Sequence, residues 1–145
     1  MTEADRAVRA AVYAHFVEFG TAPTKATLAS ATSMDGGAVE ESLSRLAEHH
    51  RLVLAPGNRS VTMAHPFSGF RTGYRARIGD RTWHANCGWD AFAILSLLGD
   101  GEVLADSPLD TTTSAWRVGD GVVSPGGFMH FVVPARSFWD DIAFT

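Results

Sequence analysis

A cysteine and an aspartate three residues later are the residues of this chain best suited to chemistry. They lie within Thr82–Phe92, and if a helix begins just after Cys87, its free N–H groups and positive dipole end favour the thiolate. Asp90 then belongs to the same first turn. Because the sulfur is a soft ligand and the carboxylate can carry a proton, we expect both to face one small volume. Three aromatic residues are the predicted walls of a substrate pocket: Trp83, Trp89 and Phe92.

Other uses of these residues stay open at this point. A free cysteine is often a buried apolar side chain, and an acid in a first helical turn commonly offsets the helix dipole. His84, Cys87 and Asp90 could bind zinc, although a structural zinc site needs four protein ligands. With His84 as base, Cys87 could be a hydrolase nucleophile, but no oxyanion donor can be named. The remaining histidines are interpreted as structural: His15, His49, His50, His65 and His130.

The first third of the chain is predicted to form three helices. Apolar residues recur there at three- and four-residue spacing, after which Gly20 supplies a stop. A second, shorter helix is predicted over Lys25–Ala31. Asp35 or Ser33 can cap a third helix, which we expect to end near His50.

A short hairpin is predicted after these helices. Two β-prone runs flank turn-forming residues at 56–58: Leu52–Ala55 and Ser60–Met63. Three helices followed by a hairpin are typical of a winged-helix module, so we expect one over residues 1–66. We interpret His65–Gly69 as a linker, since a residue before proline is disfavoured in a helix and its neighbours form turns.

Residues 67–145 are predicted to form a small, mostly antiparallel sheet with one central helix. An alternating pattern over 74–78 and a return over Arg81–Ala85 predict a hairpin that turns at residues 79–80. The helix is predicted over Trp89–Leu98, with Leu95 and Ser96 facing inward and Gly99 as its end. Four later runs predict strands, the last ended by Pro134: Val103–Ala105, Ala115–Val118, Val122–Val123 and Phe128–Val133. The expected fold class is therefore α+β.

The charge of the chain argues against DNA binding. Twelve basic and sixteen acidic residues give a net charge of -4. A winged-helix module normally reads DNA with its third helix, where this chain offers Arg45 beside three glutamates. Arg51 and Arg59 of the hairpin region favour the opposite view, so a DNA-binding regulator that senses a thiophilic metal or electrophile through Cys87 stays an alternative.

A basic cluster precedes the cysteine. Its four arginines lie on or next to the predicted hairpin: Arg71, Arg75, Arg77 and Arg81. They could bind an anion or coat the hairpin, and we expect the second, because strand positions that face water are commonly charged.

Length and hydropathy exclude several classes of protein. The chain has 145 residues, of which 46% are hydrophobic, and this predicts a folded globular unit. No stretch approaches the roughly 20 consecutive apolar residues of a membrane span, and the start lacks the apolar core of a signal peptide. One cysteine excludes an intrachain disulfide. We expect a soluble, cytoplasmic protein without membrane contact. The oligomeric state is not predicted from the sequence.

The order of these parts resembles the alkylmercury (organomercurial) lyase family. The resemblance rests on a three-helix winged module, an aromatic-rich strand, the Cys-x-x-Asp word of Cys87–Asp90 at a helix start, and a late hydrophobic strand that ends in proline. It covers most of the chain. In that family the Cys-x-x-Asp word opens the central helix of the catalytic domain, which the resemblance places over residues 67–145.

The resemblance implies protonolysis of carbon–mercury bonds. Cys87 would be the thiolate that captures mercury, and Asp90 the carboxylate that relays a proton to the departing carbon, so both would be ligands of mercury as substrate or product. A soft thiolate prefers a soft metal, and protonation of the carbon releases a hydrocarbon. No organic cofactor is implied, mercuric ion is the expected product ligand, and small-molecule thiols are expected co-substrates.

The family usually employs a second cysteine, which this chain does not contain. Alignment of residues 131–134 and 140–145 with the late segment of the family places that thiol just past Thr145. The chain could thus be a shortened member, a divergent member that binds and does not cleave, or one that uses an external thiol. A small-molecule-binding enzyme on the same scaffold is a third function class, marked by an apolar pocket without metal affinity.

Overall fold

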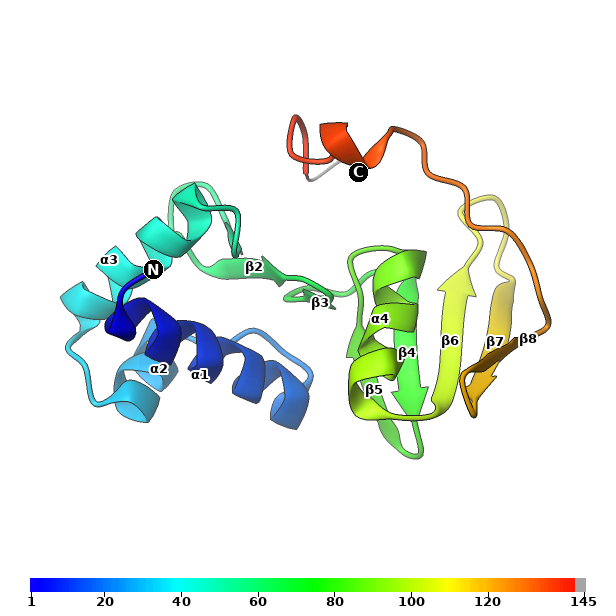
Figure 1. The fold of residues 1–145 in the computed structure, drawn as a ribbon, viewed down its shortest axis with the longest axis horizontal. Coiled ribbons are helices and arrows are strands. Elements are labelled where there is room, and N and C mark those ends of the chain that lie inside the picture. The colour runs from blue at the N-terminus through cyan, green and yellow to red at the C-terminus, as the bar shows by residue number, and fades with distance from the viewer. Residues whose placement is uncertain (143–145) are drawn as a thin grey trace.

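Three helices and a small sheet precede a larger antiparallel sheet that carries the fourth helix (Figure 1). The computed structural model describes residues 1–142. In the view of Figure 1 the three helices lie to the left and the larger sheet to the right, with the small sheet between them. No helix within residues 1–142 is long and apolar enough to cross a bilayer. The order of elements confirms the predicted α+β class.

Local capping fixes the ends of the N-terminal helices, which cover these ranges: α1 Glu3–Phe19, α2 Lys25–Thr32 and α3 Gly36–Glu48. Thr2 and Asp5 exchange side chain to backbone hydrogen bonds at the start of α1. Gly20 ends that helix with φ of 69°, a left-handed conformation that glycine adopts at little cost. Of the two predicted caps of α3, Asp35 accepts the capping hydrogen bond, whereas Ser33 ends α2.

The small sheet has the strand order β1-β2-β3 and is antiparallel, with these bounds: β1 Val53–Leu54, β2 Val61–Ala64 and β3 Phe67–Ser68. The first two strands form the predicted hairpin. The linker predicted over His65–Gly69 is wrong, because β3 pairs with β2 and Phe67 is 1% exposed. Its ring stacks on Phe16 of α1 at 5.5 Å, so burial of an aromatic side chain orders a segment rich in turn formers.

The larger sheet has the strand order β5-β4-β6-β7-β8, and every neighbouring pair is antiparallel. Its strands have these bounds: β4 Tyr74–Ile78, β5 Arg81–His84, β6 Gly101–Asp106, β7 Thr113–Gly119 and β8 Val122–Ser124. The predicted hairpin and the first three of the four later runs are therefore strands. The sheet presents one face to a helix, as expected for an antiparallel sheet with a single covered side.

Arginines of the basic cluster are engaged within the molecule. Arg75 on β4 pairs with Asp106 on the neighbouring strand β6, and Arg77 pairs with Glu102 on the same strand. The Arg81 guanidinium donates to two backbone carbonyls at the end of α1 and lies over the ring of Trp83. These three arginines coat the hairpin and join it to its neighbours.

One hydrophobic core extends through both halves of the chain. Helix α4 covers Gly88–Leu98 and buries Leu95 against the sheet, whereas Ser96, predicted to face inward, is exposed. Trp83 on β5 is 3% exposed, and its indole N–H donates to the carbonyl of Phe16 at 3.0 Å. The sheet is therefore fixed to α1 through a buried aromatic contact.

The predicted strand over Phe128–Val133 is wrong. The segment is irregular and pairs with no strand of residues 1–142. Pro125 and two following glycines interrupt the chain after β8. Phe131 packs instead on the start of α4, where its ring meets that of Trp89 edge to face at 6.0 Å, whereas Phe128 and Val132 are exposed. An apolar run alone does not distinguish a strand from such a packed segment.

The C-terminal segment returns over α4 toward the three helices, coloured orange to red in Figure 1. A short 3₁₀ helix, η1, covers Ala135–Ser137 and follows Pro134. Beyond it, the ring of Trp139 stacks on His50 at 4.1 Å and meets His65 at 5.9 Å. The end of the described chain is thus held against the small-sheet region.

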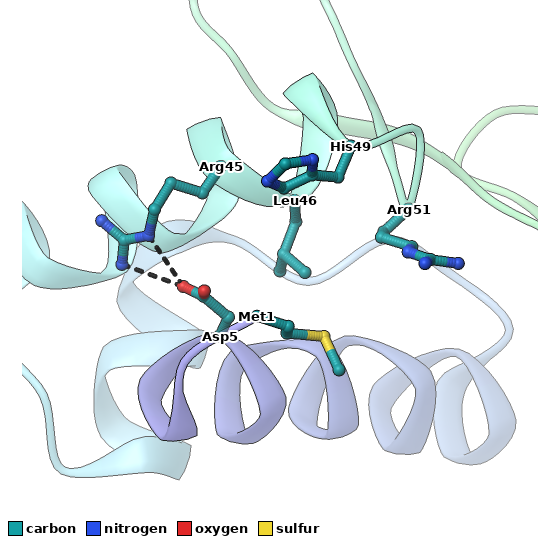
Figure 2. Close-up of a pocket in the computed structure, with 6 residues that line it drawn as sticks. All are labelled: Met1, Asp5, Arg45, Leu46, His49 and Arg51. Atoms are coloured by element: carbon teal, nitrogen blue, oxygen red, sulfur yellow. Dashed lines mark hydrogen bonds and ion pairs between the residues drawn. The ribbon is translucent and has the colours of Figure 1, made fainter.

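A buried ion pair joins α1 to α3. The side chain of Asp5 is 3% exposed, and its Oδ1 accepts from Nε and Nη2 of Arg45 at 3.0 and 2.9 Å. Figure 2 shows Arg45 reaching across to Asp5 while Arg51 points away from the pair. The guanidinium holds the pKa of Asp5 well below its usual range.

Removal of this pair should lower the free energy of unfolding. For Arg45→Met we expect a loss of about 2–3 kcal/mol in chemical denaturation at pH 7, because a buried carboxylate loses its partner. The exposed and weaker contact between Arg45 and Glu41 supplies the control, since Glu41→Gln should change stability by less than about 0.5 kcal/mol. Equal effects of both variants would contradict this assignment.

The same pair should make stability depend on pH. Because the pKa of Asp5 is lower in the folded than in the unfolded chain, its contribution is complete above the unfolded pKa and is lost as the pH falls through the folded pKa. The stability difference between the wild type and Asp5→Asn should therefore shrink as the pH falls below about 4. Urea unfolding of both proteins from pH 7 to pH 3 measures this difference, and a constant gap would contradict it.

Gly101 at the start of β6 should not tolerate a side chain. A Cβ there would lie 2.2 Å from the carbonyl oxygen of Arg77 and 2.9 Å from Ile78. We expect Gly101→Ala to lower the free energy of unfolding by about 2 kcal/mol or more, because the backbone of β4 would have to move. Gly126→Ala is the matched control, since nothing lies within 4 Å of its Cβ position. Thermal unfolding compares the two variants.

Candidate functional site

Cys87 is the residue directly before α4. Its backbone is extended, with φ of -149° and ψ of 178°, and its side chain forms no capping hydrogen bond. The residue is half-buried. The sulfur therefore lies at the amino end of the helix, where the sequence pattern predicts it, and it remains accessible to a small reactant.

The pKa of the Cys87 thiol is raised above its ordinary value, which corrects the expectation of a stabilised thiolate. Burial raises it, and the carboxylate of Asp90 raises it further, while the backbone N–H groups of Asp90 and Trp89 act in the opposite direction. The helix end does favour the anion, but desolvation of the sulfur outweighs it. Burial thus favours the protonated form of this thiol.

The carboxylate of Asp90 is turned away from bulk solvent. Its side chain is 14% exposed. Asn86 donates from Nδ2 to Oδ2 of Asp90 at 2.9 Å, and Nδ1 of His65 lies 3.3 Å from the same oxygen. Since the charge of Asp90 also affects the thiol of Cys87, sulfur and carboxylate interact across the first turn of α4.

Two neighbours of Asp90 are not among the site residues predicted from the sequence. His65 is predicted to be structural, and no role is predicted for Asn86. The position of Asn86 directly before Cys87 is a local signal that could have been used. His65 is 25 residues from Asp90, and β3 and the hairpin β4–β5 must fold before the two residues meet. No spacing rule in the sequence connects them.

The three predicted pocket aromatics are not gathered around one pocket. Trp83 is in the core, because its indole is closed between β5 and α1. Phe92 packs edge to face on Trp116, with ring centroids 6.3 Å apart. Trp89 is 57% exposed and borders a groove of about 620 Å³ beside the start of α4. The other residues that line this groove belong to the C-terminal segment: Phe131, Val132, Val133, Pro134, Ala135 and Phe138.

The zinc and hydrolase alternatives find no matching geometry. Nδ1 of His84 lies 3.2 Å from both the backbone N–H and the carbonyl of Thr72, and burial lowers the pKa of the imidazole. Its Nδ1 therefore faces the backbone of the preceding loop. Within residues 1–142, no three side chains of His, Cys, Asp or Glu are arranged to hold a metal ion.

Two of the three arginines considered for DNA binding are engaged within the molecule, whereas Arg51 is exposed. Arg45 on α3 bonds to the buried Asp5, and Arg59 donates to Ser44 at 2.9 Å. Lys25 is a further cation near α3, and it forms an ion pair with Glu40. Phosphate groups would have to compete with these contacts, which adds to the argument from net charge.

Comparison with solved structures shows a likeness in fold to a known protein. No protein-family model and no curated protein sequence matches the chain. The fold matches the crystal structure of the mercury-bound form of MerB2 with a TM-score of 0.62 and 18% sequence identity, over 86% of this chain and 59% of that one. This chain thus corresponds to about three fifths of the length of MerB2. At such low identity the match concerns the fold, which is similar to that of a protein solved with mercury bound.

Proposed function

We propose that this chain is an organomercurial lyase-like protein, which cleaves carbon–mercury bonds by protonation. The observation that carries the proposal is the start of α4, where the half-buried Cys87 directly precedes the helix and the shielded carboxylate of Asp90 belongs to its first turn. The similarity of the fold to mercury-bound MerB2 supports the same chemistry. It also agrees with the resemblance carried by the Cys-x-x-Asp word.

The reaction begins with addition of the Cys87 sulfur to mercury. A substrate R–Hg–SR′ meets the thiol of Cys87, and sulfur forms a bond to the soft metal as the thiol proton passes to Asp90. Added electron density on mercury weakens its bond to carbon. The proton then moves from Asp90 to carbon, and the electron pair of the C–Hg bond becomes the C–H bond. The products are R–H and mercury(II) held by Cys87 and SR′.

Release of mercury needs a second thiol from solution. Cys87 is the single cysteine of the chain, so a small-molecule thiol R′SH takes the mercury as Hg(SR′)₂ and returns the proton to Cys87. No organic cofactor enters this sequence. Because one thiolate holds mercury less tightly than two, we infer that turnover depends on the concentration of the external thiol.

The organic group of the substrate fits the groove beside α4. Trp89 borders it and adjoins Asp90 in the sequence, while Phe131 and Phe138 supply further apolar walls. An alkyl or aryl group placed there would bring its mercury-bound carbon to the start of the helix. Burial of apolar surface of the substrate would then help to position the bond that breaks.

Release of hydrocarbon tests the proposed reaction. Incubation of the protein with methylmercury or a phenylmercury salt and excess small thiol should yield methane or benzene above the control that contains thiol alone. Cys87→Ser should abolish this yield, because oxygen is a poor ligand for mercury. Asp90→Asn should lower the rate at least about 100-fold, since it removes the proton carrier.

A matched control for the carboxylate is Asp80→Asn. Asp80 is exposed in the turn between β4 and β5, a position that asparagine tolerates, and the variant should keep the rate of the wild type. Gas chromatography of the headspace measures all four proteins. Absence of hydrocarbon above the thiol control in the wild type would overturn the proposed catalysis.

Retention of mercury tests the role of the sulfur alone. After exposure to mercuric ion and removal of the excess, native mass spectrometry should show one mercury per chain for the wild type and for Asp90→Asn. Cys87→Ala should show none, because the thiolate is the ligand that holds the ion. Equal retention by Cys87→Ala would place the metal elsewhere in the chain.

A further inference from the structure

We propose that His65 and Asn86 are positioning residues that hold the Asp90 carboxylate in place for proton transfer. This inference rests on the proposed function and assigns a role to two residues outside the Cys-x-x-Asp word. It follows from the hydrogen bonds around Asp90, from the fixed position of His65 and from two buried polar atoms in the same cluster.

The two side chains approach one oxygen of Asp90 from different parts of the fold. Asn86 comes from the residue before Cys87, and its Nδ2 lies 2.9 Å from Oδ2. His65 comes from the turn after β2, and its Nδ1 lies 3.3 Å from that same atom. With Oδ2 held by these neighbours, Oδ1 is the oxygen available to receive and deliver the proton. A carboxylate held in this way loses the freedom to rotate out of the site.

His65 is itself held through both its backbone and its imidazole. The hydroxyl of Tyr13 on α1 donates to the carbonyl of His65 at 2.9 Å. The ring of Trp139 meets the imidazole of His65 edge to face, and the same indole stacks on His50. Nδ2 of Asn86 also lies 3.3 Å from Nδ1 of His65, so the two positioning residues contact each other.

Two atoms of this cluster are buried without a hydrogen-bond partner within residues 1–142, namely Nε2 of His65 and Oδ1 of Asn86. Such an atom lowers the stability of the fold when it is left unpaired. A cluster kept only for folding would be expected to satisfy them, whereas functional sites commonly retain unpaired polar groups. The position of these atoms beside Asp90 favours a role in the reaction.

This arrangement gives the helical half a role in the site. Tyr13 on α1 fixes the backbone of His65, and His65 contacts Asp90 on α4. The N-terminal helices therefore support the geometry of the carboxylate, independent of any contact with nucleic acid. Within residues 1–142, neither His65 nor Asn86 forms a hydrogen bond with the sulfur of Cys87. Mercury binding should therefore not require these two residues.

Steady-state kinetics of hydrocarbon release tests the inference. We expect Asn86→Leu and His65→Leu each to lower kcat by about tenfold or more, as is usual when partners of a reactive group are removed. The KM for the organomercurial and the retention of one mercuric ion should stay within about twofold of the wild type, because sulfur and groove are unchanged. His65→Asn, which keeps a donor near the position of Nδ1, should recover most of the lost kcat.

A control histidine separates positioning from general effects on folding. His49 is exposed at the end of α3, and His49→Leu should leave kcat unchanged. Circular dichroism and thermal unfolding identify any variant that fails to fold. If a leucine variant fails to fold, the kcat of folded His65→Asn is compared with that of the wild type. Unchanged kcat in both leucine variants, or a loss that His65→Asn does not recover, would overturn the positioning role.

An NMR measurement distinguishes failure of this inference from failure of the proposed function. In the wild type one side-chain amide proton of Asn86 should be shifted downfield and protected from exchange, and Asp90→Ala should remove both properties. An amide signal that Asp90→Ala leaves unchanged overturns the arrangement, whatever the activity. A shifted and protected amide in a wild type that releases no hydrocarbon supports the arrangement and overturns the lyase proposal alone.

Discussion

The indole of Trp83 joins the two halves of the chain, and the position of the site depends on that contact. The ring is buried between β5 and α1, where its N–H bonds to the carbonyl of Phe16. Phe16 in turn stacks on Phe67 of β3. These aromatic contacts fix the small sheet next to the start of α4, and the turn after β2 can then bring His65 to Asp90.

At the start of α4, burial and the helix end have opposite effects on the pKa of the Cys87 thiol. The backbone N–H groups lower the pKa of Cys87, but desolvation has the larger effect. A thiol that keeps its proton until a metal displaces it suits a reaction in which that proton has to reach carbon. The neighbouring carboxylate is shielded yet hydrogen-bonded, which avoids the cost of an isolated buried charge.

Local patterns predicted much of the fold, and long-range contacts account for the errors. Periodicity and capping placed the helices, and Gly20 ends α1 as expected. The linker over His65–Gly69 and the strand over Phe128–Val133 were wrong, because turn formers and apolar runs do not reveal which distant surface a segment packs on. Cys87 and Asp90 are close in sequence, so a local pattern can connect them. His65 was missed because only the tertiary fold places it beside Asp90.

The hydrogen bond from Tyr13 to the carbonyl of His65 has a consequence for how such proteins can be rearranged. A recombination event or an engineered fusion with its junction between α3 and His65 would replace the tyrosine that supports the carbonyl of His65. A graft between relatives would therefore have to carry the tyrosine and the histidine on the same exchanged segment.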